Sequence, residues 1–111
     1  PVAVLLIAVL HFIPDADDPY AIVRQLTDVL PAGSYLVICH AANDIYADEV
    51  AEGIRRYNAS GPAQMRPRNH AEVLRFFDGL ELIGPGVVPI SDWLKEDDEP
   101  MAAYVGVARK P

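Results

Sequence analysis

The sequence predicts an α/β fold in which a crossover helix joins two parallel strands. Residues 2–10 form a continuous apolar run that ends at a turn beginning with His11. A second apolar run, residues 34–40, follows a helix-like segment and a turn at Gly33. Neither run alternates between apolar and polar residues, which is typical of parallel strands that are buried on both faces. Strand, helix and strand in this order predict a right-handed βαβ unit.

Three helices are expected from their caps and their apolar spacing. Asp17 or Asp18 can cap the first helix, and Pro19 suits its first turn. Asn69 is followed three positions later by Glu72, which is the spacing of a capping box. The predicted helices cover residues 19–30, 47–57 and 70–77.

The C-terminal part predicts a pair of strands. Residues 80–83 form one strand, which a turn at residues 84–86 separates from its extension over residues 87–90. Residues 101–108 form the last strand, and their short separation from the preceding one favours an antiparallel hairpin at the sheet edge. We expect a single domain over residues 1–111, equivalent to half of a doubly wound sheet. Its first strand needs neighbours on both sides, which indicates a fragment of a longer protein or a chain completed by a partner.

Composition narrows the classes of function. The chain has 111 residues, 51% of them hydrophobic, and a net charge of −7. This acidic balance argues against nucleic acid or an anionic membrane surface as a partner. Cys39 is the single cysteine, so an internal disulfide is excluded and a cytoplasmic location is expected. We expect it to be an inert core residue. The first apolar run is too short to span a bilayer, and the spacing of His, Asp and Glu indicates no metal site.

Four segments in order resemble a known family. Residues 9–15, VLHFIPD, resemble the turn after the fourth strand of class I S-adenosylmethionine-dependent methyltransferases. Residues 30–37, LPAGSYLV, resemble the approach to the fifth strand, and residues 77–82 and 104–110 are similar to the C-terminal strands. The combination is most similar to a bacterial S-adenosyl methyltransferase family whose substrates are mostly unassigned. The resemblance covers essentially the whole chain and implies the C-terminal half of a Rossmann-like sheet. The glycine-rich cofactor loop of such enzymes has no counterpart in these residues.

The resemblance implies a cofactor wall at the end of the first strand. Ala8, Val9 and Leu10 would line the methionyl part of S-adenosylmethionine, largely through backbone carbonyls. His11 follows them and would contact cofactor or substrate. The alternative for His11 is a hydrogen bond within the turn.

Substrate-facing residues are expected after the second strand. By resemblance, His40, Asn43 and Tyr46 would face a small-molecule methyl acceptor. His40 and His11 are the candidate catalytic residues, with His40 as a general base. The alternative for His40 is a residue at the strand end with a local partner.

Other polar and aromatic residues have structural alternatives. Asp15, Asp17 and Asp18 resemble paired acid–base carboxylates, but helix capping explains them better. Several residues are candidates for a lid over the substrate pocket, and the alternative is ordinary packing of the aromatics with solvated arginines. These lid candidates are Tyr57, Met65, Trp93 and residues 66–68.

The favoured function is therefore that of a fragment of an S-adenosylmethionine-dependent methyltransferase that acts on a small molecule, the fragment alone being inactive. Its partners would be the methyl acceptor and either the missing N-terminal half or a second copy of the chain. The alternative is a non-catalytic α/β module that associates through its first strand, because an uncovered strand edge favours association. The distal half of a nicotinamide-dependent reductase is less favoured, since no Tyr-x-x-x-Lys pair is present.

Overall fold

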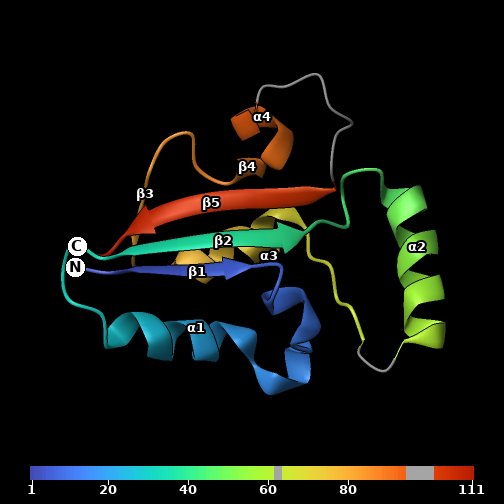
Figure 1. The fold of residues 1–111 in the computed structure, drawn as a ribbon, viewed down its shortest axis with the longest axis horizontal. Helices are drawn as coiled ribbons and strands as arrows, with labels where there is room; N and C mark the ends of the chain where they lie inside the picture. Colours follow the sequence, from blue (N-terminus) through green and yellow to red (C-terminus); the bar gives the residue numbers. More distant parts are fainter. Residues whose placement is uncertain (62–63, 95–101) are drawn as a thin grey trace.

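The computed structural model describes residues 1–61, 64–94 and 102–111. Their sheet has the strand order β1-β2-β5-β3, and β4 also pairs with β5. Figure 1 shows the two termini together at one end of this sheet. The strands are β1 (Ala3–Ile7), β2 (Tyr35–Ala41), β3 (Glu81–Leu82), β4 (Val88–Pro89) and β5 (Ala103–Arg109). The α-helices are α1 (Pro19–Asp28), α2 (Ala47–Ser60), α3 (His70–Leu74) and α4 (Ile90–Leu94).

The predicted βαβ unit is confirmed. β1 and β2 pair in parallel, from Ala3 opposite Tyr35 to Ile7 opposite Cys39, and α1 connects them. The carboxyl ends of both strands therefore lie at the same end of the sheet. In Figure 1 these ends point toward α2, which stands apart from the sheet.

The predicted caps are also confirmed. The Asp18 carboxylate accepts a hydrogen bond from the Ala21 amide at the start of α1. Asn69 and Glu72 form the capping box of α3, with side chain to backbone distances of 2.9 Å in both directions. α3 ends at Leu74, and a 3-10 turn carries the chain on to Phe77. No described helix is long and apolar enough to cross a membrane. A cytoplasmic location stays a prediction.

The first strand is shorter than predicted. β1 ends at Ile7, where the sequence predicts a strand over residues 2–10. The Ala8 amide makes the last ladder bond, at 3.0 Å to the Cys39 carbonyl, and Ala8 then adopts a left-handed conformation with φ of 58°. This conformation turns the chain out of the sheet, and Leu10–Phe12 forms a 3-10 turn.

The predicted antiparallel pairing of the C-terminal strands is confirmed, but the last strand, β5, does not lie at the sheet edge. β5 lies inside the sheet and is antiparallel to β2 on one side and to β3 and β4 on the other. The segments that pair with its outer side are shorter than predicted, because residues 80–83 contribute two strand residues and residues 87–90 turn into α4 after Pro89. Met101, the first residue of the predicted last strand, lies outside the described residues.

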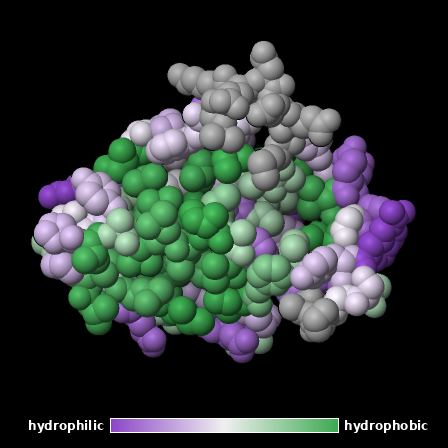
Figure 2. Space-filling view, in the orientation of Figure 1, coloured by the Kyte–Doolittle hydropathy of each residue, from purple (hydrophilic) through white to green (hydrophobic). Residues whose placement is uncertain are grey.

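Only one face of the parallel pair is covered within the described chain. Val4 and Leu6 of β1 pack against the hydrophobic core, whereas Leu5 and Ile7 are 60% and 49% exposed. Figure 2 shows the resulting hydrophobic surface over the sheet. β1 pairs with β2 alone among the described strands. The expectation of burial on both faces is thus not met by these residues themselves.

Gly106 of β5 supports the close packing of Phe77 on the sheet. A Cβ atom at this position would lie 2.9 Å from the Phe77 ring and 3.0 Å from Val87. We expect Gly106→Ala to lower the free energy of unfolding by about 1–3 kcal/mol, as overpacking of a core does. Urea unfolding followed by circular dichroism measures this loss.

Gly53→Ala is the matched control. Gly53 lies on α2, and a Cβ there would meet no atom within 4 Å apart from its chain neighbours and the backbone of its own helix, among the described residues. We expect this substitution to raise the free energy of unfolding by about 0.5–1 kcal/mol, because alanine favours the helix. Equal stability of the two variants would contradict the packing of Phe77 against β5.

Candidate functional site

The candidate site lies where the two parallel strands end. Residues 8–15 follow β1, and residues 42–46 follow β2. The segment 65–68 crosses both, with its Arg66 amide bonded to the His11 carbonyl at 2.6 Å. The carboxyl ends of parallel strands are the usual place for ligands in α/β sheets.

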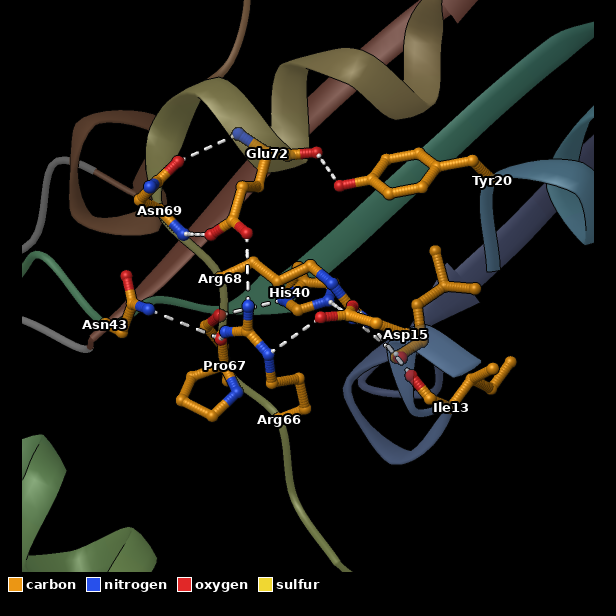
Figure 3. Close-up of polar contacts among 12 residues, drawn as sticks. Ile13, Asp15, Tyr20, His40, Asn43, Arg66, Pro67, Arg68, Asn69 and Glu72 are labelled. Carbon is orange, nitrogen blue, oxygen red and sulfur yellow. Dashed lines mark hydrogen bonds and ion pairs between the residues drawn. The ribbon is translucent and has the colours of Figure 1, made fainter. Parts of the chain in front are cut away.

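Arg68 is the central side chain of this region. It is fully buried, and its backbone amide bonds to the Ala41 carbonyl at 3.0 Å, so residue 68 is fixed to the end of β2. Its guanidinium reaches the turn after β1 and donates to the Leu10 and Ile13 carbonyls at 3.1 and 2.9 Å. It also donates to Asp15 at 2.8 Å (Figure 3). Arg68 thus joins the segments that follow the two strands.

The fourth acceptor of the Arg68 guanidinium fixes the tautomer of His40. His40 Nε2 lies 2.9 Å from Arg68, and a guanidinium can only donate, so Nε2 is the acceptor. The proton of the neutral ring is then on Nδ1, which donates to the Ala41 carbonyl at 2.8 Å. Burial and the Arg68 charge lower the pKa of His40 to about 4. Both ring nitrogens are occupied, so His40 has the local partners of the structural alternative.

The other titratable groups respond to the same guanidinium. Its hydrogen bond to Asp15 holds the pKa of that carboxyl below its usual value. Burial, followed by the charge of Arg68, lowers the pKa of His11. His11 is 6% exposed, and its Nδ1 atom is buried without a hydrogen-bond partner in the described part of the chain. The cluster is therefore a neutral histidine pair beside the Asp15 carboxylate, which pairs with both Arg68 and Arg66.

The structure separates the four predicted cofactor residues into two pairs. Ala8 and Val9 are exposed beyond β1, whereas the side chains of Leu10 and His11 are buried. Sequence reasoning gave no role to Phe12, whose ring is 40% exposed next to this segment. Its position in the 3-10 turn brings it 4.5 Å from the His11 ring, between ring centres.

The predicted substrate residues lie at different depths. His40 is fully buried, and Asn43 is half-buried with its amide 3.4 Å from the Pro67 carbonyl. Tyr46 is 50% exposed and precedes α2 in a left-handed conformation. Of the three, Tyr46 presents its side chain to solvent most openly.

The lid candidates do not form one group. Tyr57 of α2 lies 6.3 Å from the Phe12 ring, and Asn58 holds the Met65 amide at 2.8 Å. Trp93 instead lies on α4, where it lines a surface cavity of about 450 Å³ with Pro85 and Val88. A lid that includes Trp93 is therefore not formed in this structure.

Two structural alternatives also need correction. Arg68 is buried and hydrogen-bonded through both terminal nitrogens, while its Nε has no hydrogen-bond partner among the described residues, so it is not a solvated arginine. Asp15 pairs with Arg68 and Arg66 and is not a helix cap, whereas Asp18 is. The signal that sequence reasoning missed is the acidic residue at the end of the VLHFIPD turn, which has an arginine 53 positions away as its partner.

Comparison with solved structures defines the class of fold as that of a methyltransferase. A DUF574 family protein from Streptomyces avermitilis MA-4680 is 42% identical with a TM-score of 0.93, and the match covers 100% of this chain and 45% of that one. A candidate methyltransferase from Thermobifida fusca YX is 28% identical with a TM-score of 0.79, covering 99% and 43%. An S-adenosylmethionine-dependent methyltransferase from Methanosarcina mazei shares the fold, with 13% identity, a TM-score of 0.67 and 97% and 58% coverage.

The family model of S-adenosyl methyltransferases matches residues 1–111, so the chain belongs to this family. This confirms the resemblance found in the sequence. S-adenosylmethionine is the methyl donor of the family. The chain spans less than half the length of the Streptomyces and Thermobifida proteins. A comparison with curated protein sequences gave no match.

The buried His40 predicts a defined pH dependence of stability. Its folded pKa of about 4 lies below the ordinary value of 6.5, so the unfolded state takes up the proton first as the pH falls. The contribution of the neutral His40 ring to the free energy of unfolding is complete above pH 6.5. It is lost as the pH falls toward 4, by up to about 1.4 kcal/mol per pH unit. We expect His40→Gln, whose amide oxygen can still accept from Arg68, to flatten this part of the urea-unfolding profile.

The effects of the two other groups with shifted pKa values, His11 and Asp15, can be separated from that of His40 in the same experiment. The lowered pKa of His11 adds a pH dependence of stability with the same sign to the wild-type protein and to the His40→Gln variant. The lowered pKa of Asp15 reduces stability only below the ordinary carboxyl pKa of 3.8. Proton NMR of the wild-type protein gives the direct measurement. A His40 ring signal that titrates near pH 6.5 would contradict the buried neutral ring.

Proposed function

We propose that this chain is the C-terminal half of a Rossmann-like methyltransferase domain, which transfers a methyl group from S-adenosylmethionine to a small molecule. The observation that carries the proposal is the segment after β1. There a strained backbone at Ala8 and an exposed apolar surface at Val9 and Phe12 lie at the carboxyl end of a parallel strand. The Streptomyces and Thermobifida proteins are each more than twice as long as this chain, which supports a larger domain.

The residues at this strand end fit one wall of a cofactor site. Left-handed backbone at a residue other than glycine costs about 1 kcal/mol or more and persists mainly where function or packing requires it. At Ala8 it directs the chain out of the sheet, so Val9 is exposed rather than paired. Val9 and Phe12 offer apolar contact for the aliphatic part of S-adenosylmethionine, and Ala8 offers its backbone. Leu10 and His11 would support this wall from within.

The chemistry asks little of the protein beyond alignment. When bound, S-adenosylmethionine supplies a methyl group that is activated by its sulfonium charge. The protein must hold the acceptor atom in line with the bond that breaks and exclude water. His40 has its basic nitrogen occupied by Arg68, so we assign it to support of the site rather than proton removal. We therefore favour methyl acceptors that do not need His40 to remove a proton from their nucleophilic atom.

The acceptor side is proposed at the exposed aromatic side chains of the turn after β1 and of α2 with the residue before it. Phe12, Tyr46 and Tyr57 are all exposed, and the Phe12 and Tyr57 rings lie 6.3 Å apart. Exposed aromatic side chains are the usual means of binding planar or apolar small molecules. We therefore propose a small acceptor with an apolar or aromatic body. Asn43 would contribute to the acceptor side indirectly, through the hydrogen bond that its amide donates to the Pro67 carbonyl.

The expected partner of the open sheet is the remainder of the same domain. Leu5, Ile7 and Tyr35 are exposed on the uncovered face, and β1 is an edge strand within the described chain. An apolar face of this kind is normally covered by helices, and an apolar edge is normally paired. The alternative, a non-catalytic module whose sheet continues into a second copy, uses the same edge and remains the competing proposal.

Val9 provides the test of cofactor binding. We expect Val9→Lys in the full-length protein to weaken the affinity for S-adenosylhomocysteine at least tenfold, because a long charged side chain would occupy the proposed wall. Isothermal titration calorimetry measures the dissociation constant. Val29→Lys is the control, since Val29 is 80% exposed near the far end of α1 and is expected to leave the affinity unchanged. A wild-type protein without measurable affinity would contradict the proposed function.

Hydrogen exchange of β1 separates the two partner proposals. We expect the β1 amides that β2 does not bond to be protected in the full-length protein, and this protection to be independent of protein concentration. The reason is that an edge paired within one polypeptide does not dissociate on dilution. Protection that is lost on dilution, together with a dimeric mass in sedimentation, would instead support pairing between two copies.

A further inference from the structure

We propose that Arg68 is a positioning residue that holds the cofactor-facing turn after β1 in register with the end of β2. This inference rests on the proposed function, and it gives Arg68 a role other than the lid role for which the sequence made residues 66–68 candidates. Arg68 itself does not reach the proposed wall, because its side chain is fully buried. It acts through the residues it holds.

The backbone of residue 68 is anchored to one strand end. Its amide donates to the Ala41 carbonyl at 3.0 Å, and its carbonyl accepts from the Asn43 amide at 3.1 Å. Ala42 and Arg68 form an isolated parallel bridge. Residue 68 therefore extends the sheet beyond β2, and the side chain starts from a fixed origin.

The hydrogen bonds of the guanidinium all go to the segment after β1 and to His40. Three of its four bonds go to the segment between Leu10 and Asp15, at 2.8 to 3.1 Å. The fourth goes to His40. This residue directly follows Cys39, the last residue of β2 that pairs with β1. Each terminal nitrogen thus makes two bonds, a geometry that the planar guanidinium allows and the single ammonium of lysine does not.

A constraint on the turn is needed at this point of the chain. The ladder with β2 ends at the Ala8 amide, and residues 8–12 continue as a left-handed residue followed by a 3-10 turn. Short 3-10 turns have weaker hydrogen-bond geometry than sheet or α-helix. The carbonyls that Arg68 holds, Leu10 and Ile13, flank Phe12 on both sides. Fixing these two carbonyls fixes the exposed residues on which cofactor and acceptor binding depend.

The test compares charge with geometry in the full-length protein. We expect Arg68→Lys to weaken the affinity for S-adenosylhomocysteine at least tenfold in calorimetry, although the positive charge is kept. Asp15→Asn keeps the shape of its partner and is expected to weaken the affinity severalfold. In the double variant the two losses are expected to be less than additive, because both substitutions loosen the same turn. Arg56→Gln is the control, since Arg56 is an exposed arginine of α2 that pairs with Glu52.

The contrary outcomes are distinct. If the Arg68→Lys and Asp15→Asn variants are folded by circular dichroism and bind with the wild-type affinity, Arg68 contributes only to stability and the inference is wrong. If the Arg68 variant does not fold, Asp15→Asn decides alone, because it leaves the arginine in place. If neither the wild-type protein nor Arg56→Gln binds, the proposed function fails and the inference falls with it. A shift of the His40 ring signals in the Asp15→Asn variant gives a further readout of the clamp, independent of cofactor.

Discussion

The carboxyl end of the sheet depends on one buried guanidinium. Arg68 has no exposed surface, and burying a charge is costly unless it is paired and hydrogen-bonded. Here the compensation comes from one carboxylate, two carbonyls and one imidazole nitrogen. Loss of any one of these partners leaves a buried charge underbonded. The positions of the turn after β1 and of the residues after β2 are consequently linked to each other.

The same charge decides the protonation of its neighbours. An arginine that donates to His40 Nε2 excludes a proton from that nitrogen, and its field also opposes a charge on His11. The two rings, 5.7 Å apart, are thus kept neutral beside a carboxylate that stays ionised. Two histidines at the ends of parallel strands suggest acid–base chemistry when seen in the sequence. In the fold they form a neutral support for a turn.

Local chemistry was predictable from the sequence, and distant pairing was not. The capping box of Asn69 and Glu72 spans three residues, so its signal is contained in the sequence itself. Asp15 and Arg68 are 53 positions apart, and nothing near either residue indicates that they meet. Likewise, the two segments after α3 gave the strands but not the placement of β5 between β2 and β3, because pairing order depends on the complete sheet. The family motifs located the strand end without revealing which of its side chains are buried.

The first strand shows what an apolar pattern encodes. Val4 and Leu6 are packed on the core, while Leu5 and Ile7 are exposed on the other face, so the described fold uses only half of the pattern. A strand that needed one buried face would gain nothing from apolar residues on the other, where an alternating pattern would suffice. The four residues are nonetheless equally apolar. The sequence of β1 is thus matched to an environment with a layer on each side, and the proposed remainder of the domain is the simplest source of the second layer.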